Sequence, residues 1–258
     1  MNFPIIDADA HISPPGQGGN SQTLEQLLQS LDYAGVDKAL AWLQPPYLRE
    51  IDEANQYIYQ AMQNHPDRIL GFGWVDPNLG VSKALDMAKK CLYEYDLFGV
   101  KLNGAQNSYY IDDLELTGSI IEEIAQSGKV LAFHVGADAY EYTHPFRVAK
   151  IAKMYPELKI LMVHMGGAAV PDLSDAAIEF AAECPNITLI GSAIDPPAIL
   201  KAIKTLGTDR VCFGSDTPFQ FVHVELAKYM ALLKDEVDQE GLTAILGGNI
   251  MRILGLQI

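Results

Sequence analysis

The sequence feature that most constrains the fold is a regular alternation of short apolar runs with segments of helical periodicity. The apolar runs, rich in β-branched and aromatic residues, begin near positions 4, 36, 68, 98, 130, 159, 187 and 210. The segments between them repeat their apolar residues at helical spacing, and several start with Ser, Asp or Thr and stop at Gly or Pro. Strands that alternate with helices indicate βαβ units and a parallel sheet.

The number of these units selects one architecture. Eight strand–helix units in 258 residues match the count and size of a closed barrel. An open doubly wound sheet is the alternative, but that fold usually carries a glycine-rich phosphate loop after its first strand, where this chain has DADAH. No linker or low-complexity segment divides the chain. We therefore predict an α/β fold, a (β/α)₈ TIM barrel that forms a single domain over residues 1–258.

Composition excludes several classes of partner. The formal net charge of −15, with no basic stripe, argues against nucleic acid. No apolar run reaches the roughly 20 residues of a membrane helix, and the N-terminus lacks the pattern of a signal peptide. The 3 cysteines form no Cys-x-x-Cys pair, so neither a disulfide framework nor a zinc ribbon is indicated. We expect a cytoplasmic protein whose partner is a small-molecule substrate, without a membrane or nucleic-acid partner.

The stretch DADAH lies at the end of the first apolar run. Asp7, Asp9 and His11 alternate there, and alternate side chains of a strand leave the same face of the backbone. We therefore expect three potential ligands on one face. Buried carboxylates are costly unless they are paired or bind a metal, so this pattern points to a metal site.

Polar residues also follow other predicted strands, at the end where parallel barrels carry their chemistry. Taken alone, His134 fits a hydrogen-bonded core residue and Asp216 fits a helix or loop cap. His65, His144 and His223 are expected at helix ends or within a helix. The coincidence of several polar groups at strand ends of one polarity predicts a shared site. Its members are Asp9, His11, Lys101, Asn103, His134, His164, Ser215 and Asp216.

The ordered motifs resemble a known family. DADAH, GVKL, FHVG, VHMGG and FGSDTPF, followed by the closing ILGGNIMRILGL, are similar to the amidohydrolase superfamily, specifically its amidohydrolase 2 branch of metal-dependent TIM-barrel hydrolases and decarboxylases. The resemblance covers the whole chain. It implies one divalent metal ion, zinc by expectation with manganese as the alternative, and is compatible with a homodimer formed through the outer helices.

The resemblance also implies roles for individual residues. The implied metal ligands are Asp9, His11, His134 and Asp216. Most relatives have His where this chain has Asp9, and an oxygen ligand shifts the preference from zinc toward manganese. Asp216 would accept a proton in a hydrolytic mechanism, and His164 would act as acid or base or polarise a carbonyl.

The other candidate residues would contact the substrate. Lys101 is expected to bind substrate or support the site, with a carbamylated lysine that bridges two metals as the alternative. Asn103, Arg49 and Tyr140 are further substrate-binding candidates, and Asp7 is expected to support the metal pair.

Both hydrolysis and decarboxylation occur in this branch, and the fold does not choose between them. A decarboxylase must hold a carboxylate, and only Arg49 and Arg147 among the arginines follow strands in a position to do so. Because the loops are short, we predict hydrolysis of a small ester, lactone or amide by a metal-activated water. Decarboxylation of a small aromatic or unsaturated carboxylic acid is the alternative, and a non-catalytic binding barrel is a second alternative.

Overall fold

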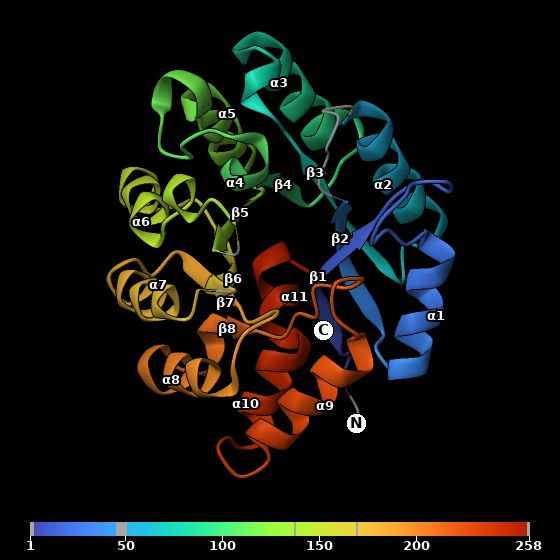
Figure 1. Ribbon diagram of the computed structural model, residues 1–258, viewed down its shortest axis with the longest axis vertical. Helices are drawn as coiled ribbons and strands as arrows, with labels where there is room; N and C mark the ends of the chain where they lie inside the picture. Colours follow the sequence, from blue (N-terminus) through green and yellow to red (C-terminus); the bar gives the residue numbers. More distant parts are fainter. Residues whose placement is uncertain (1–2, 45–50, 137, 169, 257–258) are drawn as a thin grey trace.

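The computed structural model describes residues 3–44, 51–136, 138–168 and 170–256, and within them the predicted barrel is confirmed. Eight parallel strands pair in sequence order, each with the next along the chain (Figure 1). The strands are β1 (Ile6–Ile12), β2 (Lys38–Leu43), β3 (Ile69–Trp74), β4 (Gly99–Leu102), β5 (Val130–Gly136), β6 (Ile160–Ala168), β7 (Ile187–Ile190) and β8 (Val211–Cys212).

Helices surround the strands, as the alternating pattern predicts (Figure 1). They are α1 (Leu24–Ala34), α2 (Asp52–Asn64), α3 (Val81–Lys89), α4 (Gly104–Asn107), α5 (Leu114–Ser127), α6 (Pro145–Met154), α7 (Asp172–Glu183), α8 (Pro196–Leu206), α9 (Val222–Leu233), α10 (Gln239–Thr243) and α11 (Asn249–Leu254). Local chemistry sets the ends of α1, because Thr23 and Gln26 form a capping box and Gly35 adopts the left-handed conformation that stops the helix.

The last strand returns to the first through backbone hydrogen bonds. The amide of Ala8 donates to Phe213 O at 3.0 Å, and the amide of His11 donates to Thr217 O at 2.8 Å. The amide of Asp216 donates to Asp9 O at 2.8 Å. Closure of the barrel therefore places Asp216 beside the end of β1.

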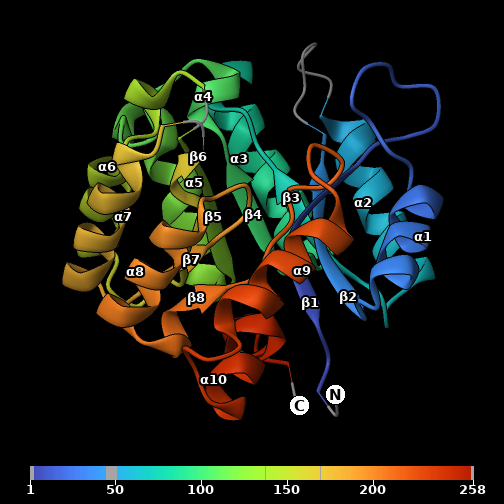
Figure 2. The same cartoon turned by 60° about the horizontal axis from the view of Figure 1, so that its bottom comes forward.

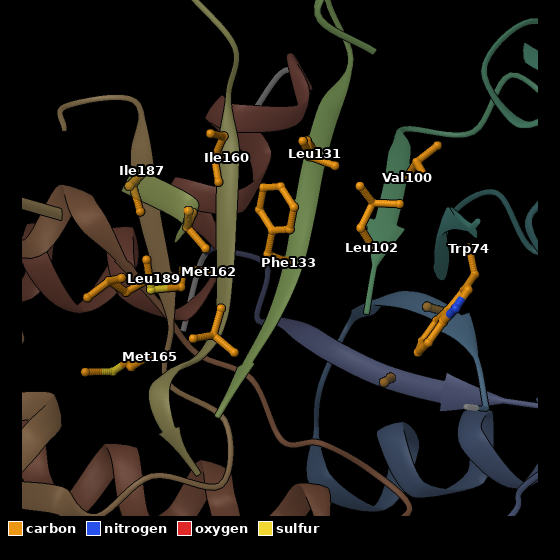
Figure 3. Close-up of a cluster of buried hydrophobic side chains, with 14 of the residues drawn as sticks. Trp74, Val100, Leu102, Leu131, Phe133, Ile160, Met162, Met165, Ile187 and Leu189 are labelled. Carbon is orange, nitrogen blue, oxygen red and sulfur yellow. The ribbon is translucent and has the colours of Figure 1, made fainter. Parts of the chain in front are cut away.

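Two apolar layers hold the barrel together. One layer lies between strands and helices, and Figure 3 shows its side chains on β4 to β7, including Val100, Phe133 and Met162. The other layer fills the barrel interior. It contains strand residues that alternate with those of the first layer, such as Phe72 and Leu161, and the α11 residues Ile250, Met251 and Ile253. The start of β1 and helix α10 lie at the end of the barrel opposite the loops that follow the strands (Figure 2). We call the end with those loops the mouth and the opposite end the base.

Strand β1 departs from the expected alternation. Its pairing with β2 shifts register between Asp7 and Ala10. Ile6 and Ala8 consequently join the interior layer, whereas Ala10 and Ile12 join the layer under the helices. The expectation that Asp7, Asp9 and His11 share one face is therefore wrong, because an irregularity of one residue inverts the alternation. Asp9 and His11 face the interior, and Asp7 does not.

No described helix is long and apolar enough to cross a membrane.

Candidate metal centre

The mouth of the barrel brings together acidic and imidazole groups from strands far apart in the sequence. His11 Nε2 lies 3.7 Å from Asp9 Oδ1 and 3.6 Å from Asp216 Oδ1. Ligand atoms of Asp9, His164 and Asp216 all lie within 4.8 Å of one another, which is close enough to share one ion. Three of the strand-end residues that the sequence singles out therefore form one cluster, with His11 at its border.

The donor set fits a divalent cation. Asp9 is fully buried, and its Oδ1 has no hydrogen-bond partner. A buried carboxylate oxygen without a donor carries a large desolvation cost, which a bound cation removes. Carboxylate and imidazole ligands suit zinc and manganese alike.

A backbone carbonyl group determines which ring nitrogen of His11 carries the proton. His11 Nδ1 lies 2.7 Å from Leu43 O, and a carbonyl can only accept, so Nδ1 carries the proton and Nε2 keeps its lone pair. Trp42 Nε1 donates to that Nε2 at 3.1 Å. Burial lowers the pKa of His11 to about 3, with Lys101 adding to the effect. His11 is therefore a neutral imidazole, the form that binds metals.

His134 lies next to this cluster rather than within it. Its Nε2 lies 3.1 Å from Gly136 O, which leaves the lone pair on Nδ1, and 3.6 Å from an oxygen of Asp138. Its ring meets the His164 ring edge-on, with the centroids 4.8 Å apart. The cluster contains His164, for which we expected acid or base chemistry, and the ligand role of His134 stays a prediction.

The backbone is strained at site residues within β6 and after β8. His164, Met165 and Asp216 adopt the left-handed conformation, with φ values of 65°, 48° and 65°. Such residues cost of order 1–3 kcal/mol each and concentrate at functional sites. Close packing accompanies them, because a Cβ on Gly167 would fall 1.8 Å from the Ser174 hydroxyl. Gly166 and Gly167, which follow Met165, thus permit this close approach.

Lys101 supplies a buried positive charge. Its Nζ lies 3.9 Å from Asp9 Oδ1 and 3.6 Å from the centre of the Trp42 ring, and it has no hydrogen-bond partner. Burial lowers the pKa of Lys101 to about 8, against the opposing effect of Asp9 and Asp216. Burial would raise the pKa of Asp9, but the charge of Lys101 and the hydrogen bond from Ser192 bring it below its ordinary value.

Burial also acts on Asp216. Together with the negative charge of Asp9, it raises the pKa of Asp216 well above the ordinary range of a carboxyl group. Unlike Asp9, the Asp216 side chain is partly exposed, at 14%. Asp216 can therefore hold a proton and reach a molecule in the mouth.

The other predicted substrate contacts occupy varied positions. Asn103 caps α4 through its Oδ1 and leaves a buried Nδ2 without a partner. Tyr140 is exposed at the loop after β5. Arg147 does not point a free guanidinium at the mouth, because it pairs with Asp112 and stacks over Tyr110. Arg49 lies outside the described residues, and His144 caps α6.

Three residues act at this site in ways that the sequence did not reveal. Asp7 accepts hydrogen bonds from the Ser215 amide and hydroxyl, which ties the loop of Asp216 to β1. Ser192 follows β7 and contacts both Asp9 and His164. The strand-end rule applied to β7 would have found Ser192, whereas Trp42 reads as an ordinary core residue in the run ALAWL.

Comparisons with known proteins agree with the fold. The family described as "Amidohydrolase" matches residues 6–256. A 5-carboxyvanillate decarboxylase from Sphingomonas paucimobilis is similar, with a TM-score of 0.80 and 18% identity over 99% of this chain and 100% of that chain.

Two further structures have the same fold. A 5-carboxyvanillate decarboxylase from Novosphingobium aromaticivorans, complexed with manganese and 4-hydroxy-3-methoxy-5-nitrobenzoic acid, has a TM-score of 0.78 and 18% identity over 99% of this chain and 97% of that chain. A 4-oxalomesaconate hydratase from Rhodopseudomonas palustris has a TM-score of 0.75 and 18% identity over 97% of this chain and 95% of that chain.

Proposed function

We propose a function for this chain from the fact that it belongs to the amidohydrolase family. The proposed function is that of a divalent-metal-dependent decarboxylase of a small aromatic or unsaturated carboxylic acid. The observation that carries the proposal is a pair of buried atoms at the mouth, Asp9 Oδ1 and Lys101 Nζ, that have no hydrogen-bond partner. One suits a metal ion and the other suits an anionic substrate. The similar decarboxylases support the choice of reaction.

Chain length gives no reason to prefer hydrolysis. We predicted hydrolysis because the loops are short, but the two decarboxylases align over 97% and 100% of their own lengths with 99% of this chain. A decarboxylase therefore needs no large insertion that this chain lacks. The decarboxylase reading, first held as the alternative, is better supported than hydrolysis.

Asp9 and Asp216 would hold the metal, with the neutral imidazoles of His11 and His164 as the adjacent nitrogen donors. When bound, a divalent ion polarises a substrate oxygen and stabilises negative charge that develops during the reaction. Manganese is the ion we propose, because two of the ligands are carboxylates and a similar decarboxylase binds manganese.

Lys101 and the surrounding rings would bind the acid. The ammonium group of Lys101 is the buried positive charge nearest to Asp9 among the described residues, and it can pair with a carboxylate or phenolate oxygen. Trp42 lies beneath it, and the partly exposed Phe219 packs edge-on against His11 with 5.7 Å between ring centres. These apolar walls suit a planar substrate.

Asp216 would supply the proton that the reaction requires. Decarboxylation breaks the bond between a carbon and its carboxylate, releases CO2, and leaves the electron pair on that carbon, which must then be protonated. Burial and the charge of Asp9 raise the pKa of Asp216, and its side chain is partly exposed, so we assign the delivery of this proton to Asp216. His164 has a pKa lowered by burial to about 3 and stays neutral beside it.

The proposal is tested by release of labelled CO2. The protein, loaded with manganese, is incubated with a panel of hydroxybenzoic and unsaturated acids carrying ¹³C in the carboxyl group, and headspace ¹³CO2 is measured by mass spectrometry. We expect release that an Asp216→Asn variant does not catalyse. Cleavage of esters or lactones, or addition of water to an unsaturated acid, without CO2 release would contradict decarboxylation and identify the reaction instead.

A further inference from the structure

We infer that Ser192 is a positioning residue of the metal centre, whose hydroxyl engages Asp9 Oδ2 and His164 Nδ1 and so leaves Asp9 Oδ1 and His164 Nε2 available. This inference rests on the proposed metal-dependent function. It gives strand β7 a part in a site for which the sequence offered no residue from that strand.

The hydrogen bonds of Ser192 have only one consistent direction. Its Oγ lies 2.5 Å from Asp9 Oδ2 and 3.0 Å from His164 Nδ1. An ionised carboxylate only accepts, so the single hydroxyl proton goes to Asp9. The hydroxyl oxygen then accepts the proton of His164 Nδ1, as does Ser192 O at 3.3 Å. His164 is therefore protonated on Nδ1 and keeps the lone pair on Nε2.

The backbone around Ser192 is built to hold this position. The preceding Gly191 donates its amide to Cys212 O at 3.0 Å and accepts a hydrogen bond from the Tyr229 hydroxyl at 2.8 Å. A Cβ on Gly191 would fall 2.0 Å from that hydroxyl. The following residue, Ala193, adopts the left-handed conformation with a φ of 53°. Ser192 itself is fully buried, so packing fixes it on both sides.

The hydroxyl also keeps Asp9 apart from His164. Asp9 Oδ2 lies 3.6 Å from His164 Nδ1, with the Ser192 hydroxyl bonded to both. Without the hydroxyl, the carboxylate can rotate to accept directly from Nδ1. That rotation would draw Oδ1 away from His11, its neighbour at 3.7 Å. Loss of the hydroxyl should therefore weaken metal binding without loss of the fold.

Manganese titration calorimetry without substrate tests the inference. We expect Ser192→Ala to raise the Kd for Mn²⁺ about 10- to 100-fold, as for other residues that orient metal ligands. Ser192→Thr, which keeps the hydroxyl, should retain most of the affinity. Ser119→Ala in α5 removes a buried hydroxyl that has no hydrogen-bond partner and lies on an outer helix, and should change nothing. An unchanged Kd in Ser192→Ala, or equal losses in the Ala and Thr variants, would overturn the inference.

Histidine NMR separates failure of the inference from failure of the proposed function. If the unaltered protein bound no Mn²⁺, the proposed function would fail, but the Nδ1 proton of His164 would still report on Ser192. We expect its resonance to shift in Ser192→Ala while that of His11, bonded to Leu43 O, stays constant. If the Nδ1 proton resonance of His164 did not shift in Ser192→Ala, the proposed role of Ser192 would be overturned.

Discussion

Polar side chains at the two ends of the barrel differ in whether they are hydrogen-bonded. At the base, long polar side chains donate hydrogen bonds to backbone carbonyl groups. Arg210 donates to the carbonyls of Ala181, Cys184 and Ile187, and the Asn186 amide donates to three further carbonyls. Arg68 there pairs with Asp32 and donates to Asp37 O. These hydrogen bonds tie neighbouring segments of the base together.

At the mouth, more deeply buried polar groups lack such bonds. Asp9 Oδ1, Lys101 Nζ and Asn103 Nδ2 are buried without hydrogen-bond partners. The left-handed residues His164 and Asp216 lie at the same end. The contrast teaches that polarity at the base stabilises the fold, whereas polarity at the mouth is destabilising in isolation and is kept for chemistry. Substitutions at the two ends should therefore separate activity from stability.

The largest expected effect is loss of turnover on replacing the proton donor at the mouth. Asp216→Asn removes the proton that the product carbon must receive, and such a group contributes about 10²- to 10⁴-fold to rate. We expect kcat to fall by that amount while the melting temperature changes little. A CO2-release assay measures kcat, and calorimetry measures the melting temperature of the same variant. Substantial retained turnover would remove Asp216 from the mechanism.

The buried lysine at the mouth should affect substrate and metal in opposite directions. Lys101→Met removes the ammonium and should lower kcat/KM about 10- to 100-fold, the worth of a hydrogen bond to a charged group. It should also tighten Mn²⁺ binding, because a positive charge 3.9 Å from Asp9 is gone. Lys38→Met at the base, where Nζ donates to Asp67 O, is the matched control. Weaker Mn²⁺ binding in Lys101→Met would contradict this arrangement of charges.

Asp7 should make stability depend on pH. Burial raises its pKa to about 7 in the folded protein, against about 3.9 in an unfolded chain. The folded state then binds more protons between these values, so the free energy of unfolding falls as pH rises from about 4 to 7, by at most about 1.4 kcal/mol per unit. Asp7→Asn should flatten this slope. Urea unfolding of both proteins at pH 5 and pH 7 measures the change in unfolding free energy between these pH values. An equal change in the two proteins would contradict this role of Asp7.

The smallest effect is expected at the base and should fall on stability alone. Arg210→Met leaves the carbonyls of Ala181, Cys184 and Ile187 without their donor and should cost about 1–3 kcal/mol of unfolding free energy. Because no mouth residue contacts Arg210 in the described part of the chain, kcat and Mn²⁺ affinity should not change. A drop in activity that exceeds the fraction unfolded would break the contrast between the two ends.

Sequence patterns predicted what depends on periodicity and on the polarity of parallel strands. The alternation of apolar runs with helical segments fixed the barrel, because burial on both faces and short connections leave few other arrangements. The rule that site residues follow strands predicts from the sequence that Asp9, His164 and Asp216 lie together. The same rule placed Arg68 and Arg210 at the base, where they lie.

Features that depend on single tertiary contacts were not predictable. The register shift in β1 moved Asp7 off the face of Asp9, and no residue type in DADAH announces it. Arg147 follows β5 as expected, yet Asp112 from a distant segment pairs with it. Ser192 was passed over because a single serine carries little information until Asp9 and His164 are seen on either side of its hydroxyl.

The measurement that tests the central claim most directly is the metal content of protein purified without added metal or chelator, determined by elemental analysis. The protein should carry about one manganese or zinc ion per chain, and an Asp9→Ala, His11→Ala double variant should carry none while it keeps its circular dichroism spectrum. Absence of metal from the unaltered protein, even after reconstitution with Mn²⁺, would contradict the claim that the unpartnered groups of the mouth form a metal centre.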